Sequence, residues 1–198
     1  MRHLVEDLLT LSRLEGSPLP SNTDWVSVSD LLVRCENEAR GLSNTLTRKQ
    51  ARPHVLNFPG AAQLKQLGEV AGASAELHSA ISNLLSNAMR YTPAGGKIDV
   101  TWEVLGDGTA RFAVKDSGPG IDAKHVSRLT ERFYRVDRSR SRDTGGTGLG
   151  LAIVKHVLQR HGAKLTIESE MGKGSEFSVI FPAPRVRASA DVVAPLLP

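Results

Sequence analysis

Cysteine is almost absent from this sequence, and so are long apolar runs. The 198 residues include a single cysteine, Cys35, which excludes a disulfide within the chain and is more typical of a reducing compartment. No apolar run approaches the roughly 20 residues that a membrane-spanning helix needs. Residues 1–14 mix charges into an apolar pattern, unlike a signal peptide. The sequence therefore predicts a soluble domain without disulfides.

The balance of residue types is that of an ordinary globular protein. Apolar residues make up 40% of the chain and charged residues 23%, which is enough for a core and a solvated surface. The formal net charge of +4 is compatible with nucleic-acid binding or with a basic solvated surface. Much of the positive charge is concentrated in residues 128–142. This concentration indicates a local anion site, which a nucleotide would satisfy as well as DNA.

Hydrophobic periodicity predicts helices that alternate with strands. Apolar residues at helical spacing predict helices at 1–15, 29–41, 75–91 and 149–161. Strands are predicted at 25–28, 54–58, 65–70, 98–104, 111–116, 165–169 and 176–181, the second and third of these from weaker patterns. Helices interleaved with hairpins predict an α+β fold, a two-layer α/β sandwich in which helices cover one face of a mixed sheet.

The chain is predicted to divide into four parts. Residues 1–15 form a helix too short to be stable alone, so we expect it to pack against a partner helix that the sequence lacks. Residues 16–24 begin with a Gly-Ser-Pro-Leu-Pro break and are expected to be a linker. Residues 25–183 form the main domain. Residues 184–198, rich in Ala, Val and Pro without periodicity, are expected to be a disordered tail.

The clearest predicted helix carries a polar stripe beside its apolar one. Asn83 and Asn87 are four residues apart, and Arg90 and Tyr91 follow about one turn later. Two side-chain amides can offer oxygen ligands to a hard cation such as Mg²⁺. Arg90 can neutralise phosphate, and Tyr91 can lie against a base. A helix with polar outer residues and no ligand remains the alternative at this point.

An acidic residue followed by two glycines ends the first predicted hairpin. The strand period of two places Asp116 on the face of Phe112 and Val114, which we expect to be buried. A buried carboxylate needs a donor, and the exocyclic amine of adenine would supply one. Gly118 and Gly120 lack the Cβ atom that would obstruct a ligand. A simple Asp-Ser-Gly-Pro turn is the alternative.

A glycine-rich segment leads into the helix at 149–161. Backbone amides of residues 145–150 can cradle phosphate at the helix N-terminus. The segment lacks the Gly-x4-Gly-Lys-Ser/Thr of a P-loop and the glycine spacing of a dinucleotide fingerprint. A flexible loop without a ligand is the alternative. A mobile, anion-seeking lid is favoured by the upstream arginines Arg132, Arg135, Arg138, Arg140 and Arg142.

In their order, these motifs resemble the nucleotide-binding boxes of bacterial sensor histidine kinases. The resemblance covers about residues 25–182, and the amino-acid sequence at 129–137 and 150–156 is most similar to that of the phosphate-regulon sensors of this family. The boxes lie at 83–88 (N box), 116–120 (first glycine box), 131–135 (F box), 146–151 (second glycine box) and 172–175 with Phe177 (final glycine box).

The resemblance implies the Bergerat ATP-binding fold, shared with gyrase, the Hsp90 chaperone and mismatch-repair ATPases, and it implies binding of ATP with Mg²⁺. In this family Asn87 would ligate Mg²⁺ and Asn83 would support the phosphate side of the site. Asp116, helped by Ser175, would read the adenine amine. The other implied site residues are Arg90 and Arg135 for phosphate, Tyr91 and Ile121 for the adenine ring, Gly118 and Gly120 for close approach, and Phe133, Gly146, Thr147, Gly148, Leu149 and Gly150 in the F box and lid.

One position separates kinases from ATPases in this superfamily. The ATPases carry a glutamate base one helical turn before the Mg²⁺ asparagine, where this chain has Asn83, whose amide cannot take a proton at neutral pH. A gyrase-like ATPase is therefore disfavoured, and no nucleic-acid partner is expected. The resemblance implies instead transfer of the γ-phosphoryl group to a histidine and then to a response-regulator aspartate, in phosphate-starvation signalling.

The phosphoacceptor histidine of the family is followed by an acidic residue and soon by Arg/Lys-Thr-Pro. None of the six histidines here has that context. The chain is therefore expected to be a fragment that binds ATP but contains no catalytic residue, with residues 1–15 as the remnant of the second dimerisation helix. Its partner would be its own dimerisation domain. The implied parent is homodimeric and anchored in the bacterial inner membrane, with this domain on the cytoplasmic side.

Two other functions remain open. A protein serine kinase of the anti-sigma-factor type shares the nucleotide site, but such domains stand alone, without the N-terminal helix and linker. A nucleotide-sensing module without transfer activity is the second. The complete set of boxes weighs against this module, but a lid locked in an inactive conformation would be compatible with it.

Overall fold

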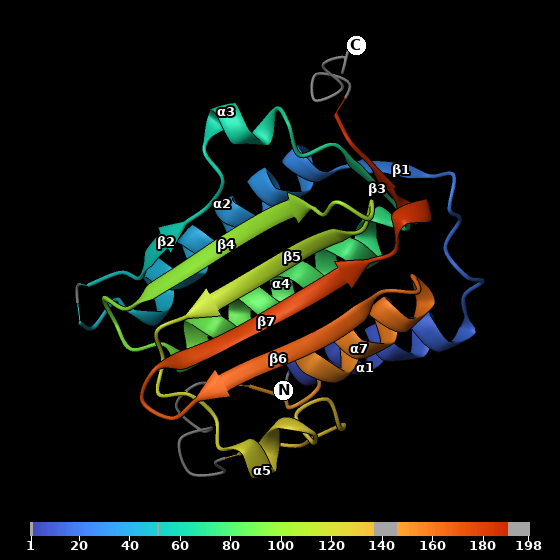
Figure 1. Cartoon of the computed structure of the whole chain (residues 1–198). Coiled ribbons are helices and arrows are strands. Elements are labelled where there is room, and N and C mark those ends of the chain that lie inside the picture. The colour runs from blue at the N-terminus through green and yellow to red at the C-terminus, as the bar shows by residue number, and fades with distance from the viewer. Residues whose placement is uncertain (1, 51, 137–145, 190–198) are drawn as a thin grey trace.

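The computed structural model describes residues 2–50, 52–136 and 146–189 (Figure 1). Its helices are α1 (Arg2–Gly16), α2 (Val28–Leu46), α3 (Ala61–Leu64), α4 (Ser74–Tyr91), α5 (Ala123–Val126), α7 (Gly150–Arg160) and the 3-10 helix η1 (Ala183–Arg185). Its strands are β1 (Trp25–Ser27), β2 (Val55–Asn57), β3 (Glu69–Ala71), β4 (Lys97–Val104), β5 (Ala110–Asp116), β6 (Lys164–Glu170), β7 (Gly174–Phe181) and β8 (Val186–Arg187).

Two sheets organise the chain. The larger sheet has the strand order β2-β4-β5-β7-β6, with β2 and β4 parallel and the other neighbours antiparallel. The smaller antiparallel sheet has the order β1-β3-β8. In Figure 1 the larger sheet lies in front of α2, α4 and α7, which cover one of its faces. The predicted α+β sandwich with a mixed sheet is confirmed.

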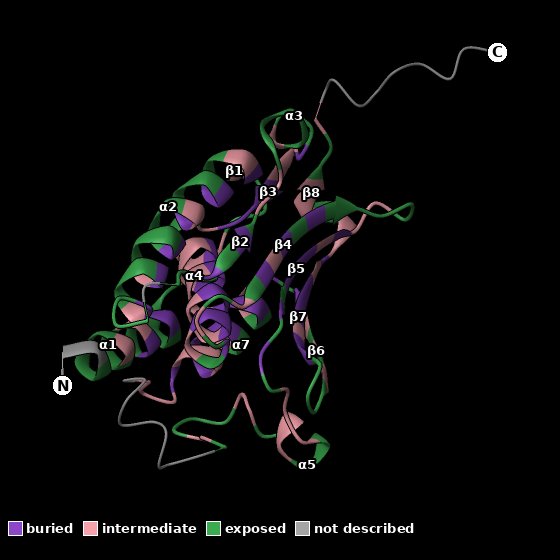
Figure 2. Cartoon of the chain, turned by 90° about the vertical axis from the view of Figure 1, so that its left-hand side faces the viewer, coloured by how far each residue is buried: buried purple, intermediate pink, exposed green. Residues whose placement is uncertain are grey.

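The core fills the space between the helices and the inner face of the larger sheet (Figure 2). Apolar residues recur in α4 every three or four positions, so that Leu77, Ile81 and Leu84 lie buried along one stripe. They belong to the same cluster as Phe112 and Val114 of β5. Burial of one such large side chain contributes roughly 1.5–3 kcal/mol. Core packing therefore fixes α4 against β5, and these elements carry much of the predicted site.

The apolar stripe of α1 is divided between the domain and solvent. Near the end of the helix, Leu11 and Leu14 are buried in a cluster that includes Ile153 of α7. Earlier in the helix, Leu4 and Leu8 are exposed. Half of α1 thus packs on the chain itself, while the other half presents apolar side chains outward. No helix in the described ranges is long and apolar enough to cross a bilayer.

The predicted linker is held against the domain. Arg160 of α7 donates to the carbonyl oxygens of Leu14, Ser17 and Pro18 at distances of 2.6 to 3.0 Å. Its Nε and Nη2 atoms also donate to the two carboxylate oxygens of Glu76, both at 2.9 Å. A guanidinium has five N–H donors on three nitrogens, and each of the three nitrogens of Arg160 donates in these contacts. The linker is therefore an ordered strap rather than a loose connection.

The expected disordered tail needs correction at its beginning. Residues 184–187 complete η1 and form β8, which pairs with β3. Arg185 donates to the carbonyl oxygens of Pro20 and Ser21 at 3.2 and 3.1 Å, so this segment also contacts the linker. The sequence conceals the pairing because β3 lies more than 100 residues earlier in the chain. Residues 190–198 lie outside the described residues.

Two predicted boundaries also differ from the structure. Helix α2 ends at Leu46 rather than at residue 41. It begins after Ser27, whose Oγ accepts a hydrogen bond from the Asp30 backbone N–H at 3.2 Å and caps the helix. Of the predicted strand at 65–70, only Glu69 and Val70 belong to β3. The preceding residues follow the short helix α3, whose one-turn length is too brief to leave a clear period in the sequence.

Candidate nucleotide site

Asp116 ends β5 on the buried face of the sheet, as its strand position predicts. Its Oδ1 accepts a hydrogen bond from the Gly118 backbone N–H at 2.8 Å. Burial raises the pKa of the Asp116 carboxyl, and backbone hydrogen bonds from Gly118 and Ser175 oppose that shift. Because a carboxylate has about four acceptor positions, Asp116 can still accept a further hydrogen bond. An exocyclic amine is a donor that would satisfy it.

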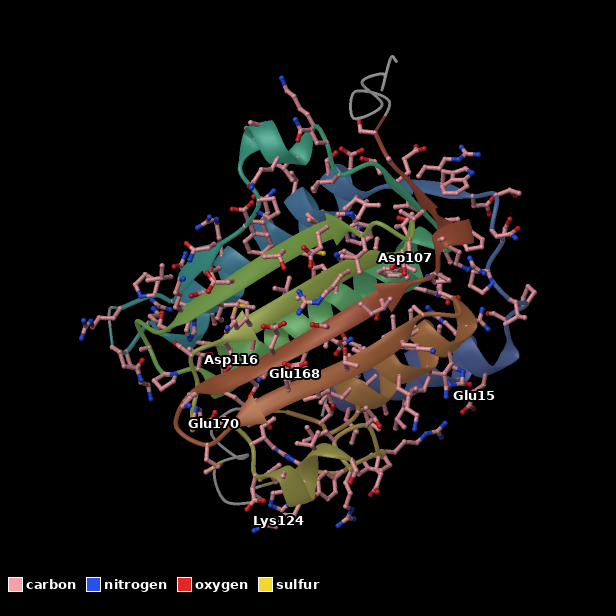
Figure 3. All side chains as sticks on the ribbon, in the orientation of Figure 1. Glu15, Asp107, Asp116, Lys124, Glu168 and Glu170 are labelled. Carbon is pink, nitrogen blue, oxygen red and sulfur yellow. The ribbon has the colours of Figure 1, made fainter. Side chains whose placement is uncertain are left out.

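The loop after Asp116 needs its glycines for two separate reasons. A Cβ atom on Gly118 would lie 2.7 Å from Asp116 Oδ1 and 3.0 Å from the carbonyl oxygen of Tyr91. Gly120 has a φ of +74°, and a Cβ atom there would lie 2.1 Å from the carbonyl oxygen of Glu170. Figure 3 shows Asp116 and Glu170 at the same end of the sheet, with Lys124 of α5 beyond them. The loop therefore lies between the end of α4 and the end of β6.

The asparagine stripe of α4 faces the start of α7. Asn83 Nδ2 donates to the Ser79 carbonyl oxygen at 2.8 Å. A Cβ atom on Gly150 would lie 2.7 Å from Asn83 Oδ1, so the glycine permits the two helices to meet at this point. Asn87 is half-buried, and Tyr91 is 50% exposed. Half-buried amides and an exposed aromatic ring are compatible with contacts to a ligand.

The two described ends of the predicted lid lie side by side. Phe133 donates its backbone N–H to the Gly148 carbonyl oxygen at 2.9 Å. Phe133 has a φ of +62°, which costs a residue other than glycine of the order of 1 kcal/mol, and its ring is 57% exposed. A Cβ atom on Gly146 would lie 3.8 Å from the Arg135 guanidinium. The predicted lid arginines at 138, 140 and 142, and Gly145, lie outside the described residues.

The start of α7 also contacts α1. Thr147 Oγ1 accepts from the Leu149 backbone N–H at 3.2 Å and donates to the Asp7 carboxylate of α1. Arg132 forms an ion pair with Glu15, labelled in Figure 3 near the end of α1. Sequence reasoning missed both contacts, because their partners lie more than 100 residues apart and follow no shared period. The N-terminal helix therefore contacts the predicted F box and lid directly.

The buried histidines have structural partners. His54 Nε2 donates to the carbonyl oxygen of Thr92, which follows α4, at 3.0 Å. His161 Nδ1 donates to the Val157 carbonyl oxygen at 2.8 Å, and its Nε2 accepts from the Ala73 backbone N–H at 3.2 Å. Burial lowers the pKa of His161, which favours the neutral ring that these two roles require. Both rings thus use their hydrogen bonds within the fold, which is a structural role.

A metal site made of charged side chains is not found in the described part of the chain. No three His, Cys, Asp or Glu side chains there are grouped so that they could hold a metal ion. A cation at this site would therefore need amide, phosphate or water oxygens. Asn87, half-buried on the stripe of Asn83, carries an amide oxygen of the kind that a hard cation binds.

Comparison with known proteins agrees with this geometry. A family model described as "Histidine kinase-, DNA gyrase B-, and HSP90-like ATPase" matches residues 72–185. Over 195 residues the chain is 47% identical to the phosphate regulon sensor protein PhoR of Pseudomonas aeruginosa, covering 98% of this chain and 41% of that protein. It thus spans less than half of that relative's length.

Solved structures of sensor kinases have the same fold. The mycobacterial sensor histidine kinase MprB has a TM-score of 0.63 at 26% identity, over 80% of this chain and 96% of that one. Full-length ShkA in complex with AMPPNP has a TM-score of 0.70 at 25% identity, over 95% of this chain and 36% of that one. The resemblance to histidine kinase ATP-binding domains is confirmed, and the chain belongs to the family of histidine kinase-, DNA gyrase B- and HSP90-like ATPases.

Proposed function

We propose that this chain is the ATP-binding catalytic domain of a two-component sensor histidine kinase. It would transfer the γ-phosphoryl group of ATP to a histidine of the kinase's own dimerisation domain, from which a response-regulator aspartate takes it. The observation that carries the proposal is the buried Asp116 carboxylate, which accepts a hydrogen bond from Gly118. Gly118 in turn lies against the backbone of Tyr91 at the end of α4. The 47% identity to PhoR supports the narrower proposal of phosphate-starvation signalling by a membrane-anchored, homodimeric parent.

Adenine would bind between the end of α4 and the end of β5. Asp116 would accept from the exocyclic amine, with the Ser175 hydroxyl beside it in the neighbouring strand. Tyr91 and Ile121 would lie against the two faces of the ring. Gly118 and Gly120 support this arrangement because any side chain there would displace the loop.

The phosphates would lie between α4 and the start of α7. Arg90 and Arg135 would neutralise phosphate charge, and the first backbone amides of α7, which have no side-chain cap, would donate to phosphate oxygens. Asn87 would hold Mg²⁺ through its amide oxygen, and the ion would supply positive charge that offsets the charge of the phosphates. Closure of the lid glycines, Gly146 and Gly148, would shield this region from water.

The chemistry favours a histidine acceptor over water. An imidazole nitrogen would form a bond to the γ-phosphorus while the bond from that phosphorus to the β,γ-bridging oxygen breaks, and ADP would leave with that electron pair. No proton acceptor for water is present at position 83, because the Asn83 amide is neutral and its nitrogen already donates to Ser79. The domain's contribution is therefore positioning and charge neutralisation.

A calorimetric titration with Mg·ATP tests the proposal. We expect Asp116→Asn to weaken binding by at least tenfold, because hydrogen bonds to charged groups contribute roughly 1.5–3 kcal/mol. Asn87→Ala should chiefly remove the dependence of binding on Mg²⁺. Asp107→Asn is the matched control: it makes the same change in an exposed turn at the opposite end of the sheet (Figure 3).

Two results would count against the proposal. One is a folded wild-type chain that does not bind ATP, and the other is equal binding by Asp116→Asn and Asp107→Asn. The stand-alone serine kinase is less well supported, because the similarity to PhoR extends over 98% of the chain and so includes α1 and the linker. A nucleotide-sensing module would bind ATP but would not phosphorylate an added dimerisation segment that carries the acceptor histidine.

A further inference from the structure

Ser169 belongs to a row of side chains that crosses the sheet from the proposed adenine site. Asp116 of β5 pairs with Ser175 of β7, and Ser175 pairs with Ser169 of β6. Residues directly opposite each other in antiparallel strands share one face of the sheet. The three side chains therefore stand together on the helix-covered face, at the end of the sheet that Figure 3 marks with Asp116 and Glu170.

The Ser169 hydroxyl is shared by three neighbours. It accepts a hydrogen bond from the Ile121 backbone N–H at 2.7 Å. It lies 2.9 Å from Ser175 Oγ and 3.1 Å from the carbonyl oxygen of Gly174. A hydroxyl has one hydrogen and two lone pairs. Ile121 occupies one lone pair of Ser169. If the Ser169 hydrogen is donated to Gly174, the Ser175 hydroxyl donates to the second lone pair; if it is donated to Ser175, the Ser175 hydroxyl accepts.

The loop that carries Ile121 rests directly on the turn between β6 and β7. The Gly172 backbone N–H donates to the Pro119 carbonyl oxygen at 2.7 Å. The Gly120 Cα approaches the Glu170 carbonyl so closely that a Cβ atom would lie 2.1 Å from it. The Ser169 hydroxyl adds a side-chain bond to this backbone contact. Two hydrogen bonds and one close backbone approach thus join the loop to the end of β6 and the turn that follows it.

We propose that Ser169 is a positioning residue for adenine recognition. Its hydroxyl holds the Ile121 backbone and the Ser175 hydroxyl in place relative to the Asp116 carboxylate. The inference rests on the proposed ATP site and adds to it a residue that does not touch the nucleotide. Because Ser175 and Asp116 would face the exocyclic amine, the loss of Ser169 should affect base selectivity as well as affinity.

The test compares ADP with inosine diphosphate, which lacks the exocyclic amine, in calorimetric titrations of the 198-residue chain with Mg²⁺. We expect Ser169→Ala to weaken ADP binding about tenfold and inosine diphosphate binding about threefold at most, so that the preference for adenine falls. Ser169→Thr, which retains a hydroxyl on a strand residue, should restore the preference. Thr166→Val is the matched control, since it removes a hydroxyl from the outer face of the same strand.

Three outcomes decide the matter. A reduced preference in Ser169→Ala, restored in Ser169→Thr and unchanged in Thr166→Val, supports the inference. Equal weakening of both nucleotides, or none, overturns it and leaves Ser169 with a purely structural role. Failure of the wild-type chain to bind ADP contradicts the proposed function itself, and the inference with it. The melting temperature of each variant without nucleotide reports any loss of folding separately.

Discussion

Replacing Arg160 with methionine should lower the free energy of unfolding by about 3 kcal/mol. Methionine retains part of the aliphatic volume but removes the ion pair with Glu76, in which the two side chains are only 8% and 16% exposed. Loss of one partner of a buried pair costs roughly 3–5 kcal/mol, because the other charge is left uncompensated. The lower end of that range applies here, since the linker residues Ser17 and Pro18 are exposed and water can replace their lost donor.

Chemical denaturation measures this change, and thermal melting checks it. For a chain of this length, about 3 kcal/mol corresponds to a fall in melting temperature of roughly 6–12 °C. Arg160→Lys should cost less, about 1–2 kcal/mol, because lysine keeps the charge but cannot reproduce the planar fork of donors. Arg34→Met is the control: Arg34 and its partner Glu38 are 63% and 48% exposed, so its loss should cost less than about 0.5 kcal/mol.

The reasoning is refuted if Arg160→Met costs no more than Arg34→Met. That result would mean that Glu76 is solvated well enough to remain charged without a partner, and that the linker does not depend on Arg160. Arg160→Met should also make residues 16–24 more susceptible to limited proteolysis, because the hydrogen bonds from Arg160 to the carbonyl oxygens of Ser17 and Pro18 are lost.

The remaining predictions concern the candidate site. Because burial raises the pKa of Asp116, the folded chain holds this proton more readily than the unfolded chain, so stability falls as pH rises from the ordinary aspartate pKa through the raised one. Denaturation of Asp116→Asn across that window should show a smaller fall, and identical profiles would contradict the assignment. Gly150→Ala should weaken ATP binding about tenfold, because its Cβ atom would displace Asn83, and it should lack the gain of about 1 kcal/mol usual for this substitution in a helix. Unchanged affinity would show that α7 can shift to accommodate the methyl group. Incubation of the chain with γ-labelled ATP should give no acid-labile label on the protein, since none of its histidines is followed by the residues that mark the family's phosphoacceptor. Acid-labile label on the protein would contradict this prediction.

Where local pattern dominates, the sequence was a sufficient guide. The period of α4 predicted both its buried stripe and the polar stripe of Asn83 and Asn87, because a helix repeats its environment every three to four residues. The strand period likewise placed Asp116 on the buried face. These residues need only the correct local conformation to be positioned, and the order of the motifs then identified the family. The roles of the site residues in binding ATP stay predictions.

Tertiary structure alone decided which distant residues meet. The Ala/Val/Pro-rich segment after Pro182 has no strand signal, yet residues 186–187 pair with β3. Pairing at the edge of β3 gives hydrogen-bond partners to backbone N–H and C=O groups, and no pattern of side chains reports this need. The contact of Ser169 with Ile121 and that of Arg160 with the linker depend in the same way on chain segments brought together by the core. Sequence periodicity records how each element faces the core, whereas hydrogen bonds between distant segments arise only after those elements have packed.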